Sequence, residues 1–276
     1  MVMNMQELEL LLVTKGHPFE RGSFFDMFDK LGVRWTHVEQ PAARVFFTPE
    51  MAHSYDVLVM YDMPGIRFGP GGVQYEEPTQ AYTDGMLALL EQGKGMVFLH
   101  HAIAGWPAWE EYARIIGGRF LYQPDTLAGR KCQDSGYRHQ VDHQISRLTP
   151  HPITESVPES FSMTDELYLF EVFEEDVIPL LQSNYGFSAE NFYSAAKVVN
   201  EGKMFSNEGW THPDGSNLVA WVKHYLNSPI VYLQGGDDSV AWQSSEYQQL
   251  LISAIRWAGS SSALAWARER NQRKQS

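Results

Sequence analysis

The stretch 93–118 constrains the fold of this chain more than any other part of the sequence. Four consecutive apolar residues, 96–99, follow a glycine-rich turn and end on two adjacent histidines, His100 and His101. An apolar run without alternation is typical of a strand that is buried on both faces, as in a parallel sheet covered by helices. A segment with helical periodicity follows and ends at Gly117. The pattern predicts a central strand, a histidine pair at its carboxyl end and then a helix.

The residues before this stretch repeat the same order of strand and helix. Apolar runs within 8–13 and 56–62 are separated by segments whose apolar residues recur at helical spacing. Strands that alternate with helices predict a parallel sheet with right-handed crossovers and helices on both faces. Because the carboxyl ends of parallel strands meet at one edge, we expect His17, Asp62 and the histidine pair to lie close together. Ligands of open α/β sheets bind at this edge, so the sequence predicts a site there.

The second half of the chain is less regular. From His139 to Ile145, polar residues that favour solvent occupy every second position, which predicts a partly exposed strand, antiparallel or at the sheet edge. His139 and His143 would lie ~13 Å apart on such a strand, from ~3.3 Å per residue, so we expect no metal shared between them. A further buried strand, 229–234, opens into a turn at 235–238 that carries two glycines and two aspartates.

Composition limits the partners and the location of the protein. The 276-residue chain has 21 basic and 34 acidic side chains and a net charge of −13, which repels nucleic acid and disfavours polyanionic substrates. Its one cysteine, Cys132, fits a reducing compartment. No apolar run approaches the ~20 residues of a membrane span, so we expect a cytoplasmic protein without membrane contact. We expect one domain over 1–276 with a polar basic tail at 265–276, and the aromatic content is compatible with a homo-oligomer.

The two adjacent histidines cannot act alike if the backbone is extended there, because successive side chains of a strand point to opposite faces. We expect one of His100 and His101 to lie in the site and the other to support it, and the sequence leaves open which does so. A ring near the amino end of the following helix would favour neutral imidazole, which acts as base, hydrogen-bond donor or metal ligand. The alternative is two hydrogen-bonded histidines that only end a strand.

Other aromatic and acidic residues are candidates for ligand contacts. Trp106, Trp109 and Tyr112 offer a stacking surface for a sugar ring, although at least Trp109 also fits a core-facing stripe at helical spacing. Of the adjacent acids Asp165 and Glu166, at most one points inward, and a solvated turn is the alternative for both. Asp237, after the late strand, either binds a hydroxylated ligand or caps the next helix. No nucleophile elbow of the Gly-x-Ser-x-Gly type follows any predicted strand.

As a set, these motifs resemble the ThuA-like, or trehalose-utilisation, family. The resemblance implies a fold similar to the class I glutamine amidotransferases, a flavodoxin-like three-layer α/β/α sandwich around a mostly parallel sheet. It also implies a role in carbohydrate catabolism, on a neutral sugar or a keto-sugar derivative. The likeness runs from about Leu8 to Trp257, and its motifs include Thr14-Lys15-Gly16-His17, Tyr61-Asp62-Met63-Pro64-Gly65, His100-His101-Ala102, His151-Pro152-Ile153-Thr154 and Asp165-Glu166-Leu167-Tyr168.

The chain differs from the glutamine amidotransferases at one position and from many ThuA-like proteins at another. The amidotransferases carry a cysteine in the turn after the corresponding strand. That place falls on His100 or His101 here, and Cys132 lies well outside it, so we expect no glutamine amidotransferase activity. Many ThuA-like relatives carry Gly-His after the late strand, whereas this chain has Gly236-Asp237. A metal site completed at that position would therefore contain an acid.

The leading hypothesis is an enzyme that acts on a neutral sugar or a keto-sugar derivative. His100 or His101 is the expected acid/base group, and Asp62 orients the imidazole or binds hydroxyl groups. Isomerisation, elimination and hydrolysis are all open. The expected substrate contacts are His17, Trp106, Tyr112, Glu166 and Asp237.

Two alternatives remain. A metal-dependent hydrolase would use the same site, with a divalent metal that activates water. Its expected ligands are His17, Asp62, His100 or His101, and Asp237. The sequence requires no cofactor, so a metal belongs to this alternative alone. A non-catalytic protein would keep the amidotransferase-like scaffold without the nucleophilic cysteine and would bind a small neutral carbohydrate without turnover.

Overall fold

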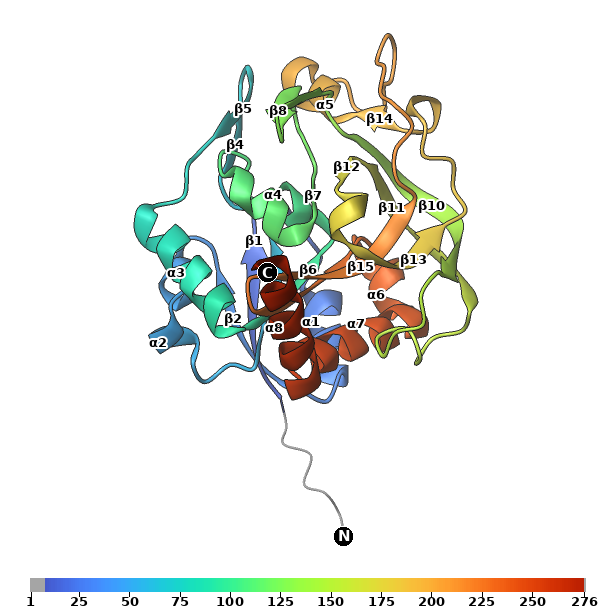
Figure 1. Cartoon of the computed structure of the whole chain (residues 1–276). Coiled ribbons are helices and arrows are strands. Elements are labelled where there is room, and N and C mark those ends of the chain that lie inside the picture. Colours follow the sequence, from blue (N-terminus) through green and yellow to red (C-terminus); the bar gives the residue numbers. More distant parts are fainter. Residues whose placement is uncertain (1–7, 276) are drawn as a thin grey trace.

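The computed structural model describes residues 8–275, which form a ten-stranded sheet covered by helices on both faces (Figure 1). The half of the sheet that contains the amino-terminal strands is parallel, as predicted. In it the apolar run before the histidine pair lies between two neighbours, which explains why both of its faces are apolar. The parallel strands are β1 (Glu9–Lys15), β2 (Arg34–Glu39), β3 (Val57–Asp62), β6 (Gly95–Leu99) and β16 (Ser228–Leu233).

The other half of the sheet is antiparallel. It contains β15 (Leu218–Tyr225), β13 (Ile178–Ser183), β10 (Gly136–Arg147) and β11 (Ser160–Leu169), and β14 (Tyr193–Ser194) pairs with β10. The complete order is β11-β10-β13-β15-β16-β6-β3-β1-β2. The strand predicted around His139 is confirmed within β10. A bulge between Arg138 and Val141 interrupts its pairing with β11, and Gln140 in the bulge has φ +54°.

Two core clusters lie on opposite faces of the sheet. In β3, Val59 and Tyr61 pack in one cluster, whereas Met60 packs in the other. This arrangement confirms the predicted α/β/α sandwich, because each face is covered by its own helices. The first face is covered by α1 (Arg21–Lys30), α6 (Ser239–Gln243) and α7 (Ser245–Ala258), and the second by α2 (Pro49–Ala52), α3 (Gln80–Gln92) and α4 (Glu110–Ile116).

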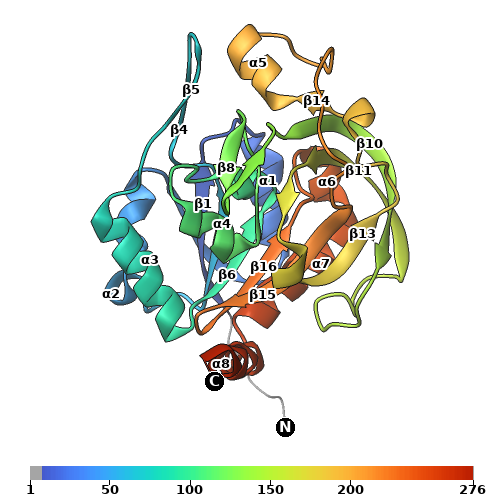
Figure 2. The ribbon, with the colours of Figure 1, turned by 45° about the horizontal axis from the view of Figure 1, so that its top comes forward.

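Short elements project from the carboxyl end of the parallel strands. Figure 2 shows the hairpin of β4 (Ile66–Gly69) and β5 (Gly72–Tyr75) at this end, together with α5 (Ala195–Glu201), which contacts β5. Two further small sheets complete the fold. They pair β7 (Gly118–Arg119) with β12 (Glu171–Val172), and β8 (Asp125–Leu127) with β9 (Arg130–Cys132).

The carboxyl-terminal segment is helical. Residues 265–275, which the sequence marks as polar and basic, belong to α8 (Ser261–Gln275), which packs against β15 and β16. Ala263 and Ala267 are buried four residues apart on one face of this helix, and the Trp266 ring lies 5.3 Å from that of Trp257. Alanines are only weakly apolar, so among basic residues they do not mark a buried helix face in the sequence. Within residues 8–275, no helix has both the length and the apolar character that crossing a membrane requires.

Candidate active site

The chain turns sharply where β6 ends. Leu99 is extended, and His100 begins a short 3-10 helix, His100–Ala104, with φ +46°. A positive φ is uncommon outside glycine and asparagine and marks a backbone position that the surrounding structure holds in place. His100 is fully buried. Because the extended backbone stops at Leu99, the rings of His100 and His101 lie 5.7 Å apart and nearly perpendicular, rather than on opposite faces of a strand.

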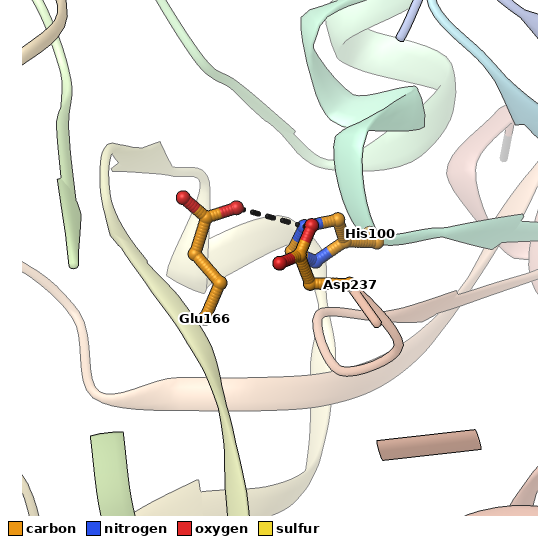
Figure 3. Close-up of side chains that lie close together, drawn as sticks. All are labelled: His100, Glu166 and Asp237. Carbon is orange, nitrogen blue, oxygen red and sulfur yellow. Dashed lines mark hydrogen bonds and ion pairs between the residues drawn. The ribbon is translucent and has the colours of Figure 1, made fainter. Parts of the chain in front are cut away.

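His100 makes contacts through both ring nitrogens. Nδ1 lies 2.6 Å from the backbone oxygen of Gln234, and since a carbonyl only accepts, Nδ1 carries the hydrogen. Nε2 lies 2.7 Å from the Tyr168 hydroxyl, 3.0 Å from Glu166 Oε2 and 3.4 Å from Asp237 Oδ1 (Figure 3). The side chain of Gln234 also accepts a hydrogen bond from the Tyr168 backbone at 3.0 Å. Four residues from two distant segments, β11 and the end of β16 with the turn that follows, therefore meet at one imidazole.

A second histidine reaches the same carboxylates. His139 Nδ1 lies 3.2 Å from Glu166 Oε1 and 3.7 Å from Asp237 Oδ2, and its side chain is 39% exposed. His100, His139, Glu166 and Asp237 are called the His100 cluster below. His139 lies within the bulge of β10, between Arg138 and Val141, whereas His143, farther along the strand, bonds to Ser183 instead. The two histidines therefore contact different partners.

Within the His100 cluster, the two imidazoles pair with the two carboxylates. Burial by itself lowers the pKa of His100, but hydrogen bonds to Asp237 and Glu166 and their negative charges raise it well above its ordinary value. A hydrogen bond to Asp237 likewise raises the pKa of His139. Burial alone would raise the pKa of Asp237, yet its bonds to these two imidazoles lower it. The carboxylates therefore favour protonated His100, and the neutral form expected from the helix end is wrong for this residue.

His101 supports the site from behind. It is 2% exposed, its Nε2 lies 3.3 Å from the Tyr61 backbone oxygen, and its ring stacks on that of His17 at 4.8 Å. Burial, followed by the charges of His17 and His100, lowers the pKa of His101 well below its ordinary value, so it is the neutral member of the pair. His17 in turn lines the pocket described below. Of the two adjacent histidines, His100 is the one that joins the carboxylates.

The two aspartates after β16 have separate tasks. Asp237 joins the His100 cluster, whereas Asp238 caps α6 by accepting from the backbone of Val240 at 2.8 Å. The capping role therefore belongs to Asp238, and Asp237 is left facing His100. Of the adjacent acids on β11, Glu166 points at His100, and Asp165 is buried behind it rather than in a solvated turn.

Asp62 ends β3 as predicted but lies outside the His100 cluster. Its buried carboxylate accepts a hydrogen bond from Gln40 Nε2 at 2.7 Å, next to the end of β2, and its charge acts on Tyr82 and Tyr112. In the sheet order, β3 lies between β6 and β1, so its final side chain has neighbours on two sides. Asp62 turns toward the β2 side, whereas His100 joins residues from the β16 and β11 side.

The burial of Asp62 gives a pH-dependent prediction. Burial raises its pKa to about 7 from an ordinary value of 3.8, so this group favours folding at low pH and that contribution is lost as pH rises from about 4 to about 7. Asp62→Asn cannot ionise. Relative to wild type, its free energy of unfolding should increase by up to about 1.4 kcal/mol per pH unit across this window. Urea unfolding at pH 5 and pH 7 checks this, and a variant that tracks wild type at both values contradicts it.

Trp106 and Tyr112 do not form the expected stacking surface. Trp106 is fully buried against the Tyr82 ring at 5.1 Å, and the Arg44 guanidinium lies 4.9 Å from the Trp106 ring centre. Tyr112 is 1% exposed and belongs to the core cluster beneath α4. The aromatic spacing after the histidine pair is therefore a core pattern, and both residues are corrected from substrate contacts to packing residues.

Different aromatic residues wall the pocket that opens beside the His100 cluster. The pocket has a volume of about 140 Å³ and contains Glu166 and His139, with His17 at its edge. Tyr168 is the pocket residue that sequence reasoning most clearly missed. It lies two positions beyond Glu166 on β11 and so shares its face, and this spacing is the signal that could have found it. The other apolar and aromatic lining residues are Phe120, Tyr122, Tyr137, Ala195, Val198 and Met204.

The fold and the site together define a class of protein. It is an α/β sandwich with a pocket at the carboxyl end of its parallel strands, where a histidine takes the elbow after the central strand. The chain belongs to the ThuA family, described as trehalose utilisation, whose model matches residues 13–258. The family predicted from the sequence motifs is thereby confirmed.

Solved structures agree with this assignment. A ThuA-like protein from Parabacteroides merdae superimposes with a TM-score of 0.64 at 16% identity, covering 92% of this chain and 91% of that one. A ThuA-like protein from Bacteroides uniformis gives 0.61 at 19% identity, with 91% of each chain covered. A cytoplasmic protein from Salmonella typhimurium gives 0.52 at 11% identity, covering 94% and 99%. No curated protein matches this chain. At these identities the likeness concerns the fold.

Proposed function

We propose that this protein is an enzyme that acts on a small neutral sugar or keto-sugar derivative, with His100 as its acid/base group. One observation carries the proposal: His100 Nε2 lies within 3.4 Å of two carboxylates, Glu166 and Asp237, beside an aromatic-walled pocket. A buried imidazole held between carboxylates is pre-organised for proton transfer. The hydrogen bond from Nδ1 to Gln234 keeps the ring in one orientation whether or not Nε2 carries a proton.

The substrate class follows from the pocket and the family. The family is described as trehalose utilisation, which favours a carbohydrate. The net charge of −13 and the two carboxylates of the His100 cluster disfavour an anionic ligand. The rings of Tyr122, Tyr137 and Tyr168 on the pocket wall suit the apolar face of a sugar ring, with hydroxyl groups left for polar partners.

The arrangement suggests how a keto-sugar would react. A carbonyl group acidifies the neighbouring C–H bond, so a carboxylate such as Glu166 removes that proton while protonated His100 or His139 donates a proton to an oxygen atom. This pair of transfers serves isomerisation, in which the oxygen is the carbonyl, or elimination, in which it is the leaving group.

Location in the cytoplasm and assembly of identical chains remain proposals that cell fractionation and gel filtration would test.

Product analysis tests the proposed function. The protein is incubated with trehalose, sucrose and their 3-keto forms, and products are followed by mass spectrometry. We expect conversion of at least one keto form by wild type. Binding of these sugars without any product would instead support the non-catalytic alternative. The absence of both binding and conversion would contradict a carbohydrate function.

A metal-dependent hydrolase is the second candidate. Ligand atoms of His100, Glu166 and Asp237 all lie within 4.8 Å of one another. The Nδ1–H of His100 donates to a backbone carbonyl, which is the usual outer contact of a metal-bound histidine. This set differs from the expected ligands, because Asp62 bonds to Gln40 and His17 stacks on His101. A divalent ion here would activate water and would keep His100 neutral.

Elemental analysis separates the two candidates. If the second candidate is right, protein purified without added metal should contain about one equivalent of a divalent ion. The double variant Glu166→Gln, Asp237→Asn should then contain at least tenfold less, because two of the three ligands lose their charge. His143→Asn, outside the pocket, is the matched control and should retain the wild-type content. Protein without stoichiometric metal, together with turnover that is insensitive to chelators, would remove the metal candidate.

A further inference from the structure

Asp165 lies directly behind the His100 cluster and is 1% exposed. Its carboxylate accepts three backbone N–H groups. Oδ1 accepts from Glu166 at 2.9 Å and from Asp237 at 3.1 Å, and Oδ2 accepts from Gly236 at 2.7 Å. Two of the three donors are thus the backbone groups of the residues whose side chains contact His100. One buried carboxylate connects β11 with the turn after β16.

The turn that carries Asp237 is fixed from its other side as well. The Gly236 carbonyl accepts from the Tyr61 hydroxyl at 3.0 Å and from Trp242 Nε1 at 2.9 Å. Gly236 has φ +108°, and a Cβ at this position would lie 2.2 Å from the Tyr247 hydroxyl, so only glycine fits here. The backbone N–H groups of the turn point to Asp165, and the Gly236 carbonyl points to the aromatic side chains opposite.

From these contacts we propose that Asp165 is a positioning residue, which sets the distance of Asp237 and Glu166 from His100 without touching the substrate. The inference rests on the proposed function, and it holds whether the His100 cluster transfers protons or binds a metal. A carboxyl group suits this task because both of its oxygens accept the N–H groups that converge on it. An asparagine would present N–H groups to one of the backbone donors and so release part of the turn.

The test compares Asp165→Asn with a control, Asp56→Asn. Asp56 also accepts a backbone N–H group, that of Glu9 at 2.9 Å, but it lies at the amino ends of β1 and β3, opposite to the end that carries the pocket. With 3-ketotrehalose as substrate, Asp165→Asn should lower kcat about 10- to 100-fold with KM changed less than threefold, the usual cost of losing an outer contact. Asp56→Asn should keep kcat within about twofold.

A second readout does not depend on turnover. Amide hydrogen exchange of residues 235–238 and the ¹⁵N resonances of the His100 imidazole are measured in wild type and in both variants. Asp165→Asn should increase exchange in this segment at least tenfold and shift the His100 resonances, and Asp56→Asn should do neither. Asp165→Ser, which leaves room for water at the backbone donors, replaces the Asn variant if that variant does not fold.

Each outcome decides the inference. Unchanged exchange, or faster exchange with kcat retained and the His100 resonances unmoved, overturns the positioning role. Wild type that converts no sugar overturns the proposed function instead, and in that case the exchange rates and the His100 resonances alone decide the role of Asp165.

Discussion

His100→Asn is expected to lower kcat by about 10²- to 10⁴-fold, the usual contribution of a positioned acid/base group. Asparagine tolerates the positive φ of this position, so the elbow after β6 should survive the change. Its side-chain amide can still donate to the Gln234 carbonyl, as Nδ1 does. The variant therefore removes little except Nε2, the atom that contacts Glu166 and Asp237.

Two controls make this result specific. His143→Asn removes a buried histidine that bonds to Ser183, away from the pocket wall, and should keep kcat within about twofold. Metal content measured on the same samples separates the two candidate functions, because loss of kcat with loss of metal indicates a ligand and loss of kcat alone indicates an acid/base group. A His100→Asn protein that keeps more than one-tenth of wild-type kcat would contradict both.

Arg119→Met is expected to reduce the free energy of unfolding by about 1–3 kcal/mol, since it leaves the buried Gly105 carbonyl without this donor, whereas the Trp109 carbonyl keeps its bond from the Tyr112 backbone. Arg119, in β7, is 1% exposed, and its guanidinium donates to the backbone oxygens of Gly105 at 2.8 Å and Trp109 at 3.0 Å. Burial lowers its pKa to about 10, so it is still charged at neutral pH. The two carbonyls flank the turn between the histidine elbow and α4, and the arginine holds that turn in place.

Arg114→Met is the matched control for this change. Arg114 lies on the exposed side of α4 and pairs with Glu110 four residues away at 2.7 Å. An exposed pair of this kind contributes about 0.3–0.5 kcal/mol. Urea unfolding of the two variants should therefore differ by about 1 kcal/mol or more. Equal effects would show that the buried guanidinium does not stabilise the turn.

The parallel half of the sheet was predictable because its signals are local. The apolar run before His100 has no polar residue on either face, and β6 is indeed buried on both. The carboxyl end of β1 brings His17 to the pocket for the same reason. The end of a strand does not determine toward which neighbouring strand its last side chain turns. Asp62 shows this limit, because its carboxylate turns toward Gln40 instead of His100.

The other half of the site depends on contacts between distant segments. His139 enters the His100 cluster from a strand that a bulge distorts, and no local pattern marks the residue that a bulge will redirect. Asp237 meets Glu166 only because β16 and β11 approach the same elbow, and Asp165 joins them through backbone donors that a sequence does not reveal. The burial of Tyr112 could have been anticipated from its helical spacing, which is more often a core pattern than a binding surface.

A crystal structure of the protein soaked with 3-ketotrehalose would test the central claim most directly. We expect the sugar in the pocket walled by Tyr137 and Tyr168, with its carbonyl or a neighbouring hydroxyl within about 3.2 Å of a nitrogen or oxygen atom of the His100 cluster. A sugar bound elsewhere on the molecule, or a structure in which Glu166 and Asp237 point away from His100, would contradict the account.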